Sequence, residues 1–438
     1  MTTDTISLLI PCRYFTNWAQ YHQQGYSYEA TDLAPISDKL AEINYAFLYF
    51  CPPPGTSPMP YWAQPPYGSC SDATAFQLMS VDPKDAVYIP QIVAMKATNP
   101  DLKVMLSVGG WNFPAAFFSA MAKTAASRAI FVASVKSWIA QFNADGVDID
   151  WEYPCAAPRT DPVEISCTDF QTVTDAGGSC PEDTANIVLL FQDLRAGLGK
   201  DMRITVASQA SKPLEIEMAI AALDPLVDAF HLMTYDYAVS DITGAVNLSP
   251  NAPLYTPSAA GAVAMSVNYT VTNYLAAGIE PSKISVGIAL YGHSFYAPGL
   301  GASAWAAFGA PSSNSGSCCG PLKATMGGQP GPFTTQCGTY MYSEIVAAGA
   351  GLHAFDNETM SDIAYFPVQG ADGYTPAGTW ISYTGPKSAD AIATYAVDNK
   401  LGGVFIFDSS MDTRVGGAWT YEVTNGIATS LTKPARRV

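Results

Sequence analysis

Three acidic side chains spaced two residues apart, Asp148, Asp150 and Glu152, are the residues of this chain best suited to acid–base chemistry. On a β-strand alternate side chains share a face, so the three carboxyl groups would form one row, with steps of about 6–7 Å. Folding alone does not explain them, because a buried strand is more stable with aliphatic residues. The competing interpretation is an exposed edge strand with solvated charges. The residues between the acids are apolar and argue for burial of the other face: Val147, Ile149 and Trp151.

Crowding of these carboxyl groups predicts that they do not all ionise together. Like charges this close raise the pKa of at least one acid and keep it protonated near neutral pH. Glu152 comes last, where a barrel strand would open to solvent and substrate, so we expect it to be the general acid. We expect Asp150 to hydrogen-bond Glu152, and Asp148 to hold Asp150.

The stretch that contains these acids resembles the signature of glycoside hydrolase family 18, the chitinases and their relatives. The family pattern is Asp-x-x-Asp-x-Asp-x-Glu, and Asp145, Asp148, Asp150 and Glu152 match it in full. The resemblance implies a (β/α)8 TIM barrel with this strand as the fourth, and Glu152 as proton donor to the glycosidic oxygen. It also implies a retaining, substrate-assisted mechanism in which Asp150 orients the substrate's acetamido group. Asp148 is then expected to take up charge and proton when Asp150 turns toward Glu152, and no cofactor is expected.

Motifs at other predicted strand ends extend the resemblance. Met233, Tyr235 and Asp236 match the family's Met-x-Tyr-Asp stretch, which lines the sugar site. This implies that Tyr235 hydrogen-bonds the N-acetyl group and that Asp236 supports binding. Residues 107–111, Ser-Val-Gly-Gly-Trp, match a Ser-x-Gly-Gly motif whose glycines let backbone segments pass closely. Aromatic residues at strand ends either stack on sugars or close the top of a core, and we expect sugar contact from Tyr14, Phe47, Trp111 and Tyr291.

Two positions depart from the family pattern. Phe407 stands where the family usually has a Trp beneath the central sugar, and a Phe ring stacks with less area. His293 stands where an Arg commonly follows Tyr-Gly, and we expect it to be structural rather than catalytic.

Strand-like and helix-like segments alternate along the chain. Strands are predicted at 6–15, 43–50, 102–108, the acidic stretch, 203–208, 230–235, 284–291 and 403–407. Helices are predicted at 37–41, 90–97, twice within 115–142, and at 185–198, 259–277 and 389–399. Eight such alternating units favour a parallel, closed (β/α)8 barrel.

One interval, 293–380, is too long for a loop. We interpret it as a small α+β insertion between strands seven and eight that walls one side of the cleft. The catalytic barrel would then comprise residues 1–292 and 381–438.

The composition limits the classes of partner that the protein is expected to bind. The 438 residues carry a net charge of −17, and 48% of them are hydrophobic, which indicates a globular core. An acidic surface disfavours nucleic acid and anionic membranes, and no apolar run is long enough to span a bilayer. We expect a monomer that binds chitin and chitooligosaccharides.

The nine cysteines lie mostly in Gly-, Pro- and Ser-rich loops, which predicts disulfides and an oxidising, extracellular location. The expected pairs are Cys51 with Cys70, and Cys337 with Cys318 or Cys319. The long loop 155–180 also looks disulfide-linked, and Cys12 is expected to be a free thiol. No metal is expected, because the chain has no Cys-x-x-Cys and only four histidines. No signal peptide is visible, so either it has been removed or the expectation of secretion rests on the cysteines alone.

Two rival functions remain open on the same barrel. A chitin-binding lectin typically loses the acid that corresponds to Glu152, which this chain keeps. An endo-β-N-acetylglucosaminidase acting on N-glycans shares the acidic strand but usually lacks the inserted module.

Overall fold

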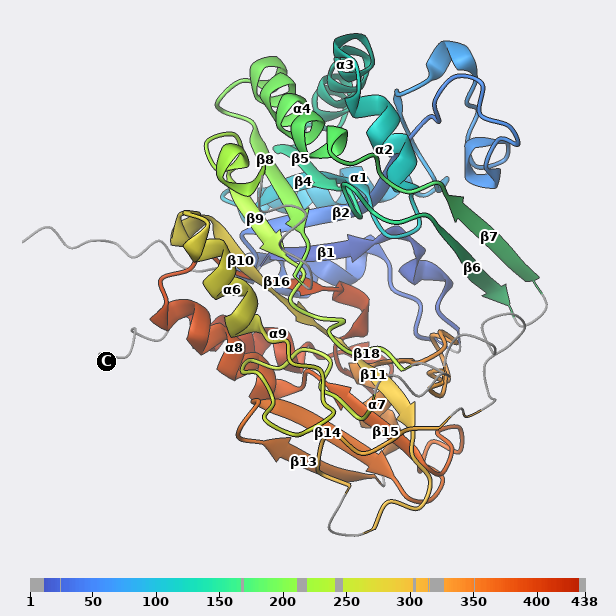
Figure 1. Cartoon of the computed structure of the whole chain (residues 1–438), viewed down its shortest axis with the longest axis vertical. Coiled ribbons are helices and arrows are strands. Elements are labelled where there is room, and N and C mark those ends of the chain that lie inside the picture. The colour runs from blue at the N-terminus through green and yellow to red at the C-terminus, as the bar shows by residue number, and fades with distance from the viewer. Residues whose placement is uncertain are drawn as a thin grey trace, which may run out of the picture.

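A closed barrel of parallel strands forms the centre of the computed structural model (Figure 1). The structure describes residues 12–23, 25–166, 169–210, 219–240, 247–301, 305–313, 315, 327–349 and 351–432. Strand β1 pairs with β2 on one side and β16 on the other, which closes the ring. The (β/α)8 barrel predicted from the sequence is therefore confirmed. Its strands are β1 (Cys12–Thr16), β2 (Glu42–Phe50), β4 (Lys103–Gly109), β5 (Gly146–Asp150), β8 (Arg203–Ser208), β9 (Ala229–Leu232), β10 (Ile284–Ala289) and β16 (Gly403–Phe407).

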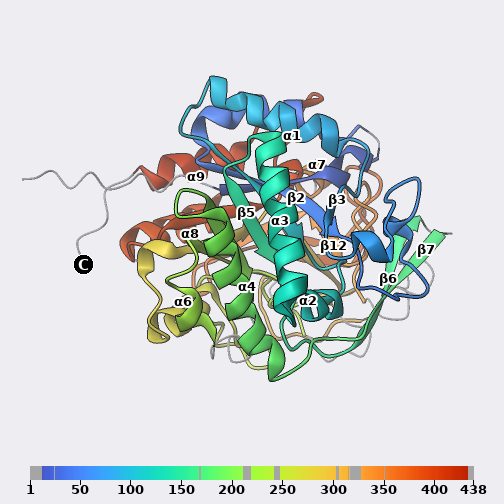
Figure 2. The ribbon, with the colours of Figure 1, turned by 90° about the horizontal axis from the view of Figure 1, so that it is seen from above.

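Helices surround the barrel, as the view from above shows (Figure 2). Their apolar sides face the outward side chains of the strands, such as Val147 and Ile149, which are fully buried. A 3-10 helix, Ala30–Lys39, stands between β1 and β2, where only 37–41 was predicted to be helical. The helices are α1 (Asp85–Ala94), α2 (Ala115–Ala122), α3 (Ala125–Phe142), α4 (Glu182–Leu198), α6 (Val267–Ala276), α7 (Tyr342–Ala348), α8 (Pro386–Asp398) and α9 (Glu422–Leu431).

A five-stranded antiparallel sheet lies between β10 and β16 in the chain and packs at one side of the barrel (Figure 1). The strand order is β12-β11-β15-β14-β13. The division of the chain at 293 and 380 stays a prediction, but the sheet's strands extend beyond both limits, to Tyr291 and Tyr383. The strands are β11 (Tyr291–Tyr296), β12 (Thr339–Met341), β13 (Leu352–Asp356), β14 (Ser361–Phe366) and β15 (Thr379–Tyr383).

The stretch 155–180, predicted to be a loop, contains an antiparallel hairpin that projects from the barrel (Figure 1). Its strands are β6 (Arg159–Ser166) and β7 (Asp169–Asp175), and a Cys155–Cys180 disulfide closes its base. A second, short hairpin precedes α9 and consists of β17 (Arg414–Val415) and β18 (Ala418–Trp419).

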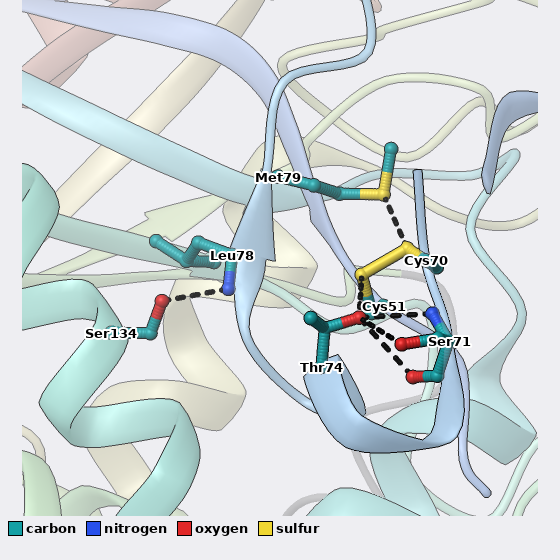
Figure 3. Close-up of a disulfide and its surroundings, with 7 residues drawn as sticks. All are labelled: Cys51, Cys70, Ser71, Thr74, Leu78, Met79 and Ser134. Atoms are coloured by element: carbon teal, nitrogen blue, oxygen red, sulfur yellow. Dashed lines mark hydrogen bonds between the residues drawn. A yellow bond between two sulfur atoms is a disulfide. The ribbon is translucent and has the colours of Figure 1, made fainter. Parts of the chain in front are cut away.

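The predicted Cys51–Cys70 disulfide is present and ties the loop after β2 to the segment before β3 (Leu78–Met79) (Figure 3). Thr74 Oγ1 lies 3.6 Å from Cys51 Sγ, and Leu78 donates its N–H to Ser134 Oγ at 2.8 Å. Among the described cysteines, Cys12 is free and buried, as predicted. The predicted pairing of Cys337 with Cys318 or Cys319 involves residues outside the described part of the chain.

Several predicted boundaries were wrong. Strand six ends at Leu232 rather than 235, where the chain enters a loop. Strand seven ends at Ala289 rather than 291, because the chain leaves the barrel there for the antiparallel sheet. The helix predicted at 259–277 begins only at Val267, where Ser266 caps it by accepting from Tyr269 N–H. The first strand was predicted from residue 6, and residues 1–11 lie outside the described part of the chain. Within the described residues, no helix combines the length and apolar character needed to cross a membrane.

Candidate active site

The row of acids follows the barrel's fourth strand, β5, as its alternating pattern predicts. Asp148 pairs in register with Ser107 on one side and Thr205 on the other, and Asp150 pairs with Gly109. Asp148 is fully buried and Asp150 is 3% exposed. Glu152 is 8% exposed and lies two residues beyond the last residue of the strand, where the ladder has already ended.

Glycine is required beside these acids. At Gly109, whose φ is +116°, a Cβ would come within 2.1 Å of the Asp150 carbonyl oxygen. At Gly110, with φ +89°, a Cβ would come within 2.5 Å of the Phe47 ring. The Ser-x-Gly-Gly motif thus lets β4 approach both the acidic strand and the neighbouring aromatic ring.

Asp148 is the acid most strongly held in its ionised form. It accepts hydrogen bonds from Tyr14 Oη at 2.8 Å, Ser107 Oγ at 2.7 Å and Thr205 Oγ1 at 2.6 Å. The His231 Nδ1 atom lies 3.6 Å from its Oδ1. Burial alone would raise the pKa of Asp148, but His231 and these hydroxyl groups outweigh burial and lower that pKa.

Asp150 and Glu152 are shifted in the opposite direction. Burial, followed by the charges of Glu152 and Asp148, raises the pKa of Asp150 well above its ordinary value. Burial raises the pKa of Glu152 from 4.5 to about 7, against the lowering effects of Tyr153 and Arg159. One buried Asp150 oxygen, Oδ1, has no hydrogen-bond partner among the described residues. The row therefore combines one fixed anion with two acids that keep their protons to higher pH.

Aromatic rings surround the acids. Tyr14 packs against Phe47 at 6.4 Å and Phe407 at 5.7 Å between ring centroids. Tyr235 packs against Phe407 at 6.2 Å and Tyr291 at 6.0 Å. Tyr14 is 2% exposed, whereas Phe47, Tyr235 and Tyr291 are 6–8% exposed, so Tyr14 lies deepest. These rings come from β1, β2, β11, β16 and the loop after β9, which the fold brings to one end of the barrel.

Asp236 lies at the edge of this group with its side chain 47% exposed. Its Oδ1 accepts from Tyr291 Oη at 2.6 Å and lies 2.6 Å from His293 Nε2. Its backbone N–H donates to Asn251 Oδ1 at 3.0 Å. His293 thus contacts a predicted substrate-binding acid directly. Met233 is half-buried and, like Tyr235, lies in the loop after β9 rather than on the strand.

Trp111 is half exposed, and Arg159 lies over its ring with the guanidinium carbon 3.8 Å from the centroid. Arg159 Nη2 also donates to the Trp111 carbonyl oxygen. Its Nε lies 3.6 Å from Asp175 Oδ2, and Asp175 accepts from Ala115 N–H at the start of α2. Arg159 thereby joins the β6–β7 hairpin to the mouth of the barrel.

The sequence reasoning missed four polar residues of this region: Thr205, His231, Asn251 and Arg159. His231 had a usable signal, because strand alternation places it on the same face as Ala229 and opposite Phe230 and Leu232. Asn251 lies on a connecting segment, and Arg159 begins β6, a strand in the stretch that was predicted to be a loop, so no periodic pattern marked either residue. The first acid of the signature, Asp145, lies outside the row and accepts from Val104 N–H at 2.7 Å.

One buried group among the described residues has side chains that could converge on a metal ion: Cys12, Glu42 and His231. Its members already have protein partners. Cys12 Sγ donates to Glu42 Oε1 at 3.5 Å, and Arg203 Nε donates to Glu42 Oε2. The contacts describe a hydrogen-bonded, ion-paired cluster, and we assign no metal to it.

Chitinases are among the known proteins that this chain resembles in sequence. Chitinase A1 of Niallia circulans is 30% identical over 320 residues, which cover 64% of this chain and 42% of that protein. A probable endochitinase of Caenorhabditis elegans is 27% identical and is matched over 57% of its length, so the chain spans about half of these curated relatives.

Solved structures share the fold. Ostrinia furnacalis Group IV chitinase in complex with allosamidin matches with a TM-score of 0.74 at 23% identity, covering 98% of this chain and all of that one. Human YKL-39, described as a pseudo-chitinase with retained chitooligosaccharide binding, matches with a TM-score of 0.73 at 20% identity, covering 97% of this chain and all of that one. A family model for the glycosyl hydrolases family 18 matches residues 12–412. The chain therefore belongs to the glycosyl hydrolases of family 18.

Proposed function

We propose that this protein is a chitinase that hydrolyses β-1,4 linkages between N-acetylglucosamine units by a retaining, substrate-assisted mechanism. The observation that carries the proposal is that the pKa values of the acids in the row are shifted in opposite directions. Asp148 has a lowered pKa, whereas the pKa of Glu152 is raised to about 7. A carboxyl group that keeps its proton near neutral pH, beside one that stays ionised, is the arrangement that acid catalysis needs. The chitinases among the curated relatives support the choice of substrate.

Glu152 is the general acid in this proposal. It transfers its proton to the glycosidic oxygen as the bond from that oxygen to the anomeric carbon breaks. The substrate's acetamido oxygen attacks the same carbon and forms an oxazolinium ion, which replaces the enzyme nucleophile of two-carboxylate glycosidases. Glu152, now ionised, then takes a proton from the water that opens the ring. Two successive inversions at the anomeric carbon give net retention.

Asp150 holds the acetamido group during this sequence. Its Oδ1 has no hydrogen-bond partner among the described residues, so this oxygen can accept the amide N–H. Tyr235 lies with Phe407 and Tyr291 beside the acids and can donate its hydroxyl to the acetamido oxygen. The sequence hypothesis let Asp148 take up a proton. Its contacts favour the ionised form, so we assign to Asp148 a fixed charge that stabilises the oxazolinium ion.

The remaining predicted substrate contacts differ in how exposed they are. Trp111 is half exposed and Asp236 has its side chain 47% exposed, so both can meet a sugar directly. Phe407 is half-buried and packs against Tyr14 and Tyr235, and we assign to it the sugar contact that a larger indole makes elsewhere in the family. Tyr14, Phe47 and Tyr291 are buried and Met233 is half-buried, and we assign these four residues to shaping the sugar site.

Glu152, and not the fold, is the feature that favours a chitinase over a lectin. The similarity to human YKL-39 means that this barrel also occurs in a protein described as a pseudo-chitinase. Fold similarity therefore does not separate enzyme from binding protein. Glu152, whose pKa burial raises to about 7, can supply the proton transfer that hydrolysis requires and binding alone does not. An endo-β-N-acetylglucosaminidase on N-glycans is the second alternative.

Cleavage of a defined N-acetylglucosamine oligomer tests the proposal. We expect β-anomeric products at early times from the native protein. We expect a loss of several orders of magnitude in kcat for Glu152→Gln with binding retained, since one essential proton transfer is removed. Glu280→Gln is the matched control, because Glu280 is exposed and distant in the fold. Near-normal turnover by Glu152→Gln would reject the assignment, and cleavage of a denatured N-glycoprotein but not the oligomer would favour the endoglycosidase.

We also propose that the protein acts as a monomer in an oxidising, extracellular compartment. The Cys51–Cys70 and Cys155–Cys180 disulfides support this location, because such bonds persist where thiols are not kept reduced. Detection of the protein only in its reduced form inside cells would contradict it.

A further inference from the structure

His231 lies in the barrel core between two buried carboxylates. It comes from β9, and its side chain is 1% exposed. Nδ1 lies 3.6 Å from Asp148 Oδ1, and Nε2 lies 3.4 Å from Glu42 Oε1. Asp148 and Glu42 are themselves 0% and 4% exposed at their side chains. A neutral imidazole has only one N–H, so it could donate to only one of these two acids.

Arg203 extends the same row on the far side of Glu42. Its Nε donates to Glu42 Oε2, and its side chain is 34% exposed. From the acidic row outward, the groups are therefore Asp148, His231, Glu42 and Arg203. Buried charges are tolerated when each is paired with an opposite charge, and a cationic His231 would give this row alternating signs.

The other groups around His231 carry no charge. From β1, Cys12 and Tyr14 both have pKa values raised well above the ordinary range, chiefly by burial. From β2, the Asn44 amide nitrogen lies 3.3 Å from His231 Nδ1. Tyr14 Oη is also 3.3 Å from Nδ1, but its proton goes to Asp148 at 2.8 Å. On β8 and β16 the neighbours besides Arg203 are the Thr205 hydroxyl, bound to Asp148, and the Phe405 ring.

We propose that His231 is a positioning residue for the hydrolysis proposed above: a buried imidazolium that forms ion pairs with both Asp148 and Glu42 and keeps Asp148 ionised. It touches no substrate and acts through Asp148. A fixed negative charge at Asp148 leaves the mobile protons of the row on Asp150 and Glu152, where the reaction uses them. The competing arrangement is a neutral imidazole that donates to Glu42 and accepts from the Asn44 amide.

The protonation state can be read directly by nitrogen NMR of the histidine-labelled native protein. The chain has four histidines, so the spectrum is sparse. His231→Gln removes one set of signals and assigns it. If that variant does not fold, replacements of His22, His293 and His353 assign the last set by elimination. We expect both His231 nitrogens to carry a proton in the native protein, as the two ion pairs require. A neutral tautomer at pH 7 would overturn the proposal, whether or not the protein hydrolyses chitin.

The pH dependence of turnover tests the effect on Asp148. In His231→Gln the acid limb of kcat/KM should move to higher pH by about 1–3 units, the range that an opposite charge at this distance accounts for. His353→Gln is the matched control, since His353 is exposed on β13, and it should leave the limb in place. Glu42→Gln should move the limb in the same direction by less, because it removes only the second partner of the imidazolium. An unmoved acid limb in a folded, active His231→Gln would refute the positioning role. A native protein without activity would instead refute the proposed function, and the NMR result would stand.

Discussion

Replacing Glu152 by Gln is expected to stabilise the folded protein at alkaline pH while abolishing catalysis. Burial raises the pKa of Glu152 from 4.5 to about 7, so the folded state binds its proton more tightly than the unfolded state does. Below pH 4.5 both states carry the proton, and Glu152 does not affect stability. Between pH 4.5 and 7 the unfolded state releases the proton first, so the wild-type protein loses stability as the pH rises.

The size of this loss follows from the shift. One pKa unit corresponds to about 1.4 kcal/mol, so a shift from 4.5 to about 7 destabilises the ionised, folded wild type by about 3 kcal/mol above pH 7. Gln is close to isosteric and carries no charge, so the variant escapes this penalty. Any change in packing or hydrogen bonding adds an offset that does not depend on pH.

Urea unfolding of both proteins at pH 4 and pH 8 measures the effect. We expect the free-energy difference between Glu152→Gln and wild type to shift by about 3 kcal/mol in favour of the variant from pH 4 to pH 8. Glu280→Gln, at an exposed position, should show no such change. An equal difference at both pH values would show that Glu152 ionises in the folded protein as it does in water, and the argument for it as the acid would fail.

Three further predictions concern activity and stability. Turnover of a chitin oligomer by the wild-type protein should fall as the pH rises through about 7, where Glu152 loses its proton. Tyr14→Phe removes the donor 2.8 Å from Asp148, so the acid limb of kcat/KM should move to higher pH. Replacing both Cys51 and Cys70 by Ser opens a crosslink with a sequence separation of 19 and should lower the unfolding free energy by about 3 kcal/mol, measured in urea.

Each of these has a distinct negative outcome. Activity that stays constant to pH 9 would contradict a proton on Glu152 as the limiting group. An unchanged acid limb in Tyr14→Phe would mean that the tyrosine does not bear on Asp148. For the disulfide, reducing agent should lower the stability of the wild type by more than that of the double variant, which keeps the Cys155–Cys180 bond, and equal responses would contradict the assignment.

The sequence predicted the barrel well because its signals are local and repeated. Each strand is a short apolar run followed by a helical segment, and the acidic strand shows period-two alternation over Val147 to Asp150. Strand ends were harder to place. The apolar run of β10 continues through Leu290 and Tyr291 into another sheet, and nothing in residue type marks the change at Ala289.

Only the part of the candidate site that lies in contiguous motifs was predicted. The acids and their neighbouring aromatics are contiguous motifs, so the chain itself displays them. The groups that set the ionisation of Asp148 come from other strands: Thr205 is 57 residues away in sequence, and Tyr14 is 134. Such contacts form only when the barrel closes. They cannot be predicted from the spacing of residues along the chain.

The stacking of Arg159 on Trp111 makes the indole a one-sided platform. With the guanidinium group 3.8 Å from the ring centroid, a flat ligand can lie only against the opposite side. A ligand that stacks on Trp111 must therefore approach the barrel mouth from that side. Because Asp175 links Arg159 to the first turn of α2, a ligand that displaces Arg159 would also pull on that helix.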